Sequence, residues 1–326
     1  MIRLVRMEML RLFSRRLFKI AAVGVLLLIT VIVVVDGVHH SKRDAAAYEK
    51  FKNERLASYD AFVAANPQPD MHPTREEVAK DPQSYCFAQQ QAPASGTEQP
   101  AQPGNPCGGA PKAPYETSVA LFDFGKAVAV ICAFAGFLIG ASAAGAEWSA
   151  GTMQSLLFWE PRRVRVVLAK VVGLSAVIVL LFLAATALFT AESYAAGQLR
   201  GTTAGLTSGL WNSYLLLMLR GVSFAGFAAV LGFSVAFGSR VTAAAVGIAF
   251  VYFAVLENLL VAWKIWLARY MIGPLLAAWL NNGIADNGDS GRALRLTGVR
   301  AGVTLSVYAV VMLAGATVWF RQRDVT

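Results

Sequence analysis

The sequence predicts an all-α integral membrane protein with six transmembrane helices. Of its 326 residues 56% are hydrophobic and 15% are charged, and the net charge is +9. The apolar residues fall in long blocks, and about 20 residues at 1.5 Å each cross a ~30 Å hydrocarbon core. The basic residues lie beside these blocks, which favours a topology signal over nucleic-acid binding. We therefore expect the lipid bilayer, and no nucleic acid, as a partner.

Residues 1–16 predict an amphipathic helix that lies at the membrane surface before the first span, residues 17–35. Apolar side chains recur there at helical spacing, with arginines between them: Leu4, Met7, Leu10 and Phe13. The apolar stretch is longer than a typical signal-peptide core and no A-x-A site ends it, so we expect the span to be retained.

Residues 36–118 form a long polar segment between the first two spans. The segment from Ser41 to Ala65 predicts a helix, and residues 93–114 are dense in Pro, Gly and Gln. With few large apolar side chains, the segment cannot bury much core, and we expect an appendage. Cys86 and Cys107 either form a disulfide, which is favoured outside the cytoplasm and contributes about 3 kcal/mol, or remain free thiols.

Five further apolar runs predict spans at residues 124–144, 166–190, 214–237, 241–262 and 299–320. Residues 263–298, between the last two spans, begin with an apolar stretch that Gly273-Pro274 interrupts and that Trp and Tyr flank. Aromatic rings prefer the membrane interface, and non-helical backbone at depth must be shielded by protein. We expect a re-entrant or interfacial helix pair before the last span.

The basic segments predict the orientation in the membrane. An even number of spans brings most of them to one side, which the positive-inside rule makes cytoplasmic; both termini are then cytoplasmic, and residues 36–118 lie outside. The residues on that side are Arg3, Arg6, Arg11, Arg15, Arg16, Lys19, Arg162, Arg163, Arg165, Lys170, Arg240, Arg321 and Arg323. Four residues of the opposite side are exceptions, namely Lys264, Arg269, Arg292 and Arg295.

Motifs for catalysis or nucleotide binding do not occur in the sequence. The only Gly-Lys pair, Gly125-Lys126, is followed by Ala127 and does not complete a phosphate loop. The His39-His40 pair could contact a metal, but no cysteine or carboxylate is spaced to complete a site there or at His72, and we expect solvated polar residues. No G-x-S-x-G elbow is present. We expect that the chain is not an enzyme and binds no metal or cofactor itself.

Charged and small residues inside the predicted spans indicate helix contacts. Arg220 and Glu257 both fall about 8–9 Å below the same predicted surface at 1.5 Å per residue, so we expect them to pair or to line one polar cavity. Separate snorkelling to the interface is the alternative. Gly136 and Gly140 form a GxxxG match that serves either intramolecular packing, which we favour, or a dimer contact.

A polar stretch, residues 146–162, follows the second span on the predicted cytoplasmic side. It combines apolar contact residues with polar edges, and Pro161 and two arginines close it. The pattern is typical of a short helix that lies at the membrane surface and docks on a soluble partner; an ordinary amphipathic loop is the alternative. The residues that we expect at such a contact are Glu147, Trp148, Gly151, Thr152, Leu156, Pro161 and Arg162.

This stretch carries a family resemblance. Four features resemble permease subunits of ABC-2-type transporters: the basic amphipathic start, the Gly145-Ala-Glu147…Gly151-Thr152…Leu156…Pro161-Arg162…Lys170 pattern, the Gly273-Pro274 element and the Phe320-Arg321-Gln-Arg323-Asp324-Val325 ending. The resemblance implies that residues 146–162 are a coupling helix for a separate soluble ABC ATPase subunit, which carries ATP and Mg²⁺. It also implies a second permease copy, identical or paralogous, and a bacterial plasma membrane.

The resemblance favours an exporter whose substrate the sequence does not name. The alternative is a non-transporting membrane module that senses or binds a ligand through the outer loop, residues 36–118. That alternative leaves the polar stretch and the element before the last span unexplained.

Overall fold

The computed structural model describes residues 2–40, 45–65, 74–80, 82, 113–152, 162–203, 205–286 and 294–322. The chain divides into two compact units. Unit 1 comprises Met1–Ile32, Ser118–Glu192 and Leu206–Thr326, and unit 2 comprises Val33–Thr117 and Ser193–Gly205.

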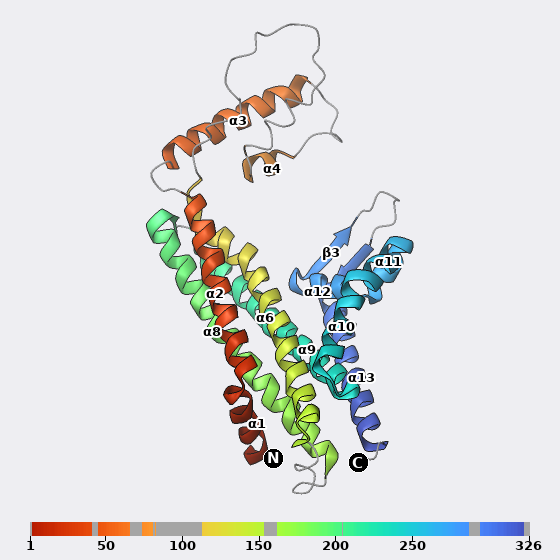
Figure 1. The fold of residues 1–326 in the computed structure, drawn as a ribbon. Helices are drawn as coiled ribbons and strands as arrows, with labels where there is room; N and C mark the ends of the chain where they lie inside the picture. The colour runs from red at the N-terminus through yellow and green to blue at the C-terminus, as the bar shows by residue number, and fades with distance from the viewer. Residues whose placement is uncertain are drawn as a thin grey trace. The chain divides into compact units, whose positions relative to one another are not determined.

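Helices form nearly all of the described structure, and six of them are long and apolar enough to cross a membrane. This confirms the predicted fold class of an all-α protein with six membrane-length helices. They are α2 (Arg16–His39), α6 (Thr117–Ser149), α8 (Arg163–Arg200), α9 (Ser208–Ser239), the helix made of α10 (Thr242–Val251), the π-helix η2 (Tyr252–Leu256) and α11 (Glu257–Trp263), and α13 (Gly298–Gln322) (Figure 1). A shorter helix, α1 (Ile2–Ser14), precedes them.

Small residues let α6 and α9 cross at very close range within unit 1. A Cβ built on Gly136 would lie 2.9 Å from the carbonyl oxygen of Ala225, and one on Gly140 would collide with the carbonyl of Ala229. On the α9 side, Gly232 lies against the backbone of Phe137 in the same way. The GxxxG match therefore serves intramolecular packing, as we favoured, because only glycine permits this approach of two backbones.

Two short helices fold back on each other between α11 and α13. The 3₁₀ helix η3 (Ile265–Tyr270) and α12 (Ile272–Leu280) meet at Met271, whose backbone is extended with φ −80° and ψ 144°. The break thus precedes Gly273-Pro274, which fall in the first turn of α12. Proline is tolerated there because the first amides of a helix have no intrahelical acceptor.

A β-hairpin follows α12, and the sequence did not predict it. Strands β3 (Gly283–Asp286) and β4 (Leu294–Thr297) pair antiparallel, with Ile284 opposite Leu296. Gly283 has φ 135°, a conformation that glycine adopts readily, and it directs the chain from the end of α12 into the hairpin.

Unit 2 contains a small helical core. Tyr59 and Leu56 on α3 (Ala45–Ala65) pack against the fully buried Val78 on α4 (Arg75–Lys80). Arg75 Nε lies 3.0 Å from Asp60 Oδ1 between the same helices. Two short strands, β1 (Tyr115–Glu116) and β2 (Gly201–Thr202), pair in parallel in this unit. Cys86 and Cys107 lie outside the described residues, so their disulfide stays a prediction.

Candidate functional site

One end of unit 1 gathers α1, the last turn of α6, the first turns of α8, the α9–α10 turn and the end of α13; we call this end the base (Figure 1). A buried group of charged side chains occupies the base. Lys170 on α8 is 4% exposed, and its Nζ lies 2.6 Å from Glu147 Oε2 on α6 and 3.0 Å from Glu8 Oε1 on α1. Glu147 and Glu8 are themselves 4% and 6% exposed.

Two arginines complete this charge network. Arg15 donates from Nη2 to Glu147 Oε1 at 2.9 Å and from Nη1 to the carbonyl oxygen of Ser142 at 2.7 Å. Arg11 Nη1 lies 3.6 Å from a carboxylate oxygen of both Glu8 and Glu147. Three cations therefore surround two carboxylates. Because buried charges are stable only when paired, Glu8, Glu147 and Lys170 depend on partners from other helices.

The network changes the role that the sequence suggested for Glu147. Its side chain is buried and both of its carboxylate oxygens have partners, so it links three helices and does not face a soluble protein. The sequence did not single out Glu8 or Lys170 as site residues. Glu8 is the only acidic residue in an otherwise basic segment, 1–16, and it lies one turn before the buried Leu12. This isolated acid at helical spacing from a core residue was the available signal.

The predicted amphipathic helix is present as α1, and its apolar stripe is largely uncovered by the protein. Met7 and Leu10 are each 60% exposed, and Phe13 is 37% exposed. The face that carries Glu8 and Leu12 is the one that packs on the bundle. The uncovered stripe has the composition of a membrane-surface helix.

Aromatic rings form a second cluster at the base, around Trp148. The Trp148 ring lies 5.9 Å from the rings of both Phe237 on α9 and Phe320 on α13, and these two phenylalanines are 5.0 Å apart. The guanidinium of Arg240 stacks over Trp148 at 4.5 Å, and that of Arg163 lies over Phe320 at 5.4 Å. Such contacts add about 0.5–1.5 kcal/mol per aromatic pair beyond buried area. Trp148 thus joins α6 to α9 and α13.

The α9–α10 turn at the base is tight. Arg240 ends α9 in a left-handed conformation with φ 63°, and its amide donates to the carbonyl of Ala236. Thr242, at the start of α10, lies against Gly145 of α6 so closely that a Cβ on Gly145 would collide with it. The base therefore holds α6, α9 and α10 in direct backbone contact.

The segment that follows Trp148 leaves α6 through a glycine. Gly151 has φ 67°, which L-residues adopt at a cost of about 1–2 kcal/mol, and a Cβ there would meet nothing within 4 Å. Gly151 and Thr152 are exposed, as is Arg162 just before α8. Residues 153–161, which include Leu156 and Pro161, lie outside the described residues. The coupling helix predicted at residues 146–162 is therefore described only where it leaves α6 and where it meets α8.

Arg220 and Glu257 do not meet in this structure. Arg220 Nη2 donates to Asn282 Oδ1 at 2.8 Å. Glu257 Oε2 accepts from the amide of Gly273 at 3.2 Å, beside the hydroxyl of Tyr252, which accepts from the amide of Ile272 at 3.1 Å. Glu257 and Tyr252 thus cap the free amides at the start of α12, a role that the pairing hypothesis did not anticipate.

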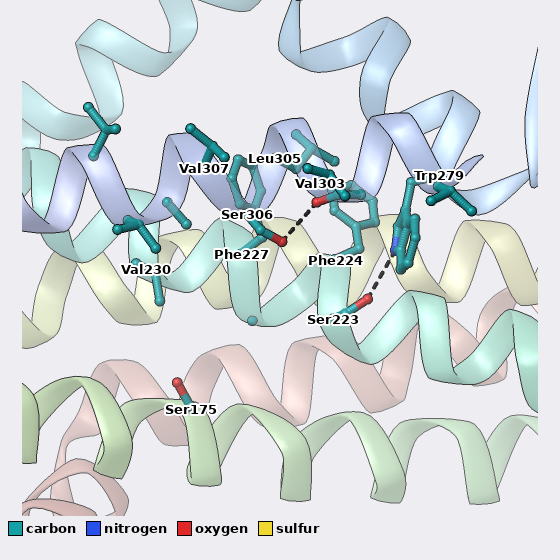
Figure 2. A pocket seen from close by; sticks show the side chains of 16 residues that line it. Ser175, Ser223, Phe224, Phe227, Val230, Trp279, Val303, Leu305, Ser306 and Val307 are labelled. Carbon is teal, nitrogen blue, oxygen red and sulfur yellow. Dashed lines mark hydrogen bonds between the residues drawn. The ribbon is translucent and has the colours of Figure 1, made fainter. Parts of the chain in front are cut away.

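A pocket of about 930 Å³ lies in unit 1 between α8, α9, α12 and α13. Figure 2 shows Phe224 and Phe227 of α9 and Trp279 of α12 along one side, with valines of α13 beside them and Ser175 of α8 opposite. Its polar groups are few. Ser306 donates to the carbonyl of Gly302 within α13, and Ser223 accepts from Trp279 Nε1 at 3.0 Å. The pocket suits an apolar ligand.

A bundle of six membrane-length helices with buried charges at one end defines a multi-pass α-helical membrane protein. In a comparison with protein families, residues 12–325 match the ABC-2 family transporter proteins. The match covers almost the entire chain, so the chain belongs to this family and is the membrane-spanning component of an ABC transporter. A comparison with curated proteins found no match.

Proposed function

We propose that this chain is the permease subunit of an ATP-driven exporter, and that a separate ATPase subunit contacts it at residues 149–162. The base is then cytoplasmic, as the positive-inside rule predicts from its many arginines and lysines. ATP and Mg²⁺ belong to the partner, and two permease chains, identical or paralogous, assemble with it. The membrane is the bacterial plasma membrane.

One observation carries this proposal: the last turn of α6, from which the exposed segment leaves, is held through two adjacent side chains. Glu147 is paired with Arg11 of α1 and Lys170 of α8, and also with Arg15, which links α1 to α2. Trp148 packs against Phe237 of α9 and Phe320 of α13. A force applied to the exposed residues beyond them is therefore passed to five helices at once. A loop without a mechanical role has no need for such anchoring.

The proposal separates two kinds of residue that the sequence grouped together. Thr152 and Arg162 are exposed and are available to a soluble partner. Glu147 and Trp148 hold the segment in place from inside the protein. Binding of the ATPase and transmission of its motion should consequently be separable by mutation.

Co-purification with a candidate ABC ATPase subunit tests whether binding and transmission can be separated. Thr152→Arg and Arg162→Glu should each weaken the complex at least tenfold, or about 1.4 kcal/mol, without lowering the melting temperature. Glu147→Gln should retain the complex and lower its ATP hydrolysis, because the contact surface is intact and the link to α1 and α8 is loosened. Lys19→Glu, a charge reversal at an exposed site on α2, is the control and should change neither property.

Two results would overturn the proposal. The first is full transport by the purified chain without any nucleotide-hydrolysing companion. The second is protease or labelling data that place Thr152 and the loop that carries Cys86 on the same side of the membrane.

A further inference from the structure

The pocket beside α13 has a cation at one end. Trp279, which lines the pocket, donates from Nε1 to the carbonyl oxygen of Arg220 at 3.1 Å, and Ser223, one turn further along α9, also lines it. The Arg220 side chain reaches Asn282, which packs against Gly298 at the first residue of α13. The guanidinium therefore lies just beyond the end of the pocket that is furthest from the base.

Arg220 lacks a charged partner within the part of the chain that the structure describes. None of the ion pairs among those residues includes it, and its described side-chain contact is the neutral Asn282 oxygen. A guanidinium has five N–H donors in a planar fork that matches a phosphate. A half-buried arginine with a neutral partner is thus suited to an anion.

The interior of the pocket is suited to a hydrocarbon chain. Its walls are valines, phenylalanines and a tryptophan, and the hydroxyl protons of Ser223 and Ser306 are donated to carbonyls of their own helices. A Cβ built on Gly226 would meet nothing within 4 Å, so the pocket is open at its α9 wall. A volume of about 930 Å³ is at the upper end of the ~300–1,000 Å³ typical of ligand pockets.

We propose that the pocket binds an acyl chain of an anionic membrane phospholipid, whose phosphate is bound by the Arg220 guanidinium. The apolar walls exclude water from the acyl chain, and Arg220 selects lipids of net negative charge. The site requires only that the protein lies in a bilayer, so it does not depend on ATP-driven transport or on its direction.

Photolabelling in nanodiscs tests the site. The wild-type protein would be exposed to trace phosphatidylglycerol or phosphatidylcholine, each with the same photoactivatable acyl chain, and labelled peptides would be mapped. Phosphatidylglycerol should label residues 223–230 and 299–311 about fivefold more, as expected for one basic residue near a membrane surface. Arg220→Gln should bring the two probes to equal labelling, whereas Arg269→Gln, at an exposed arginine of η3, should retain the preference.

A second pair of variants tests the binding of the lipid's acyl chain rather than of its headgroup. Gly226→Leu places an isobutyl group at the open wall, where a Cβ meets nothing within 4 Å, and should lower labelling by both probes. Gly24→Leu, at an equally open glycine of α2 outside the pocket, should not. Equal labelling by both probes in the wild type, or a preference that survives Arg220→Gln, would overturn the proposal. So would efficient cross-linking of two copies through Val303→Cys with no lipid label, since a second chain would then fill the pocket.

Discussion

Two parts of unit 1 differ in how far they are packed by the protein itself: α6 and α8, which we call the packed half, and α10 to α13, which we call the open half. In the most apolar windows of α6 and α8, 67% and 56% of the residues are buried, against 6% in the α10–α11 helix and 11% in α13. Each half nevertheless contains a carboxylate with a structural role. Glu147 is held by three cations in the packed half, whereas Glu257 in the open half accepts from the backbone amide of Gly273 at the start of α12. The packed half is thus held by buried side chains and ion pairs of the protein itself, whereas the open half has few buried residues in its spans.

The largest expected effect lies in the packed half. Lys170→Ala should lower the free energy of unfolding by about 3–5 kcal/mol, because it leaves two buried carboxylates short of a cation. Denaturant or thermal unfolding in detergent would measure the loss. Arg162→Ala, at an exposed basic residue near the same end, is the control. A loss below about 1 kcal/mol would show that the network is no more than a set of surface ion pairs.

A smaller effect is expected at the crossing of α6 and α9. Gly140→Ala should cost about 1–3 kcal/mol, since the new methyl group collides with the carbonyl of Ala229 and the helices must separate. The same unfolding measurement applies. Gly24→Ala, where a Cβ meets nothing within 4 Å, should be neutral or stabilising because alanine favours helix. Equal unfolding free energies of Gly140→Ala and Gly24→Ala would contradict the close crossing of α6 and α9.

The smallest expected effect lies in the open half. Glu257→Ala should cost about 1–2 kcal/mol, the typical cost of losing a helix N-terminal cap. Hydrogen exchange should localise the change to the amides of Ile272 and Gly273. Tyr252→Phe removes the other acceptor at this helix start. If both side chains cap α12, the double variant should lose less unfolding free energy than the sum of the two single variants. Faster exchange throughout unit 1 would instead assign Glu257 a global role.

Sequence reasoning recovered what depends on composition and periodicity. The six long apolar helices, the amphipathic α1 and the GxxxG crossing all follow from patterns within single segments. The charge network was not recovered, because Glu8, Glu147 and Lys170 are far apart in the sequence and their meeting depends on helix packing. For the same reason Arg220 and Glu257, which lie at similar predicted depth, were paired with each other. Depth along a helix does not determine the direction in which a side chain points.

The break before α12 shows a related limit. Gly273-Pro274 is the strongest local signal for a helix interruption, and it predicts the position of the break to within a few residues. The actual turn at Met271 has no such signal, because proline also begins helices and the turn is held by Tyr252 and Glu257 from another helix.

The turn at Arg240 has a geometric consequence for motion. It joins α9 and α10 without spare chain length, and Gly145 presses against the first residue of α10. If these two helices splay apart, the displacement must be near zero at the turn and must grow toward Trp263. The hinge end is then the one with Arg240, and the separation between α9 and the α10–α11 helix is greatest at their other ends.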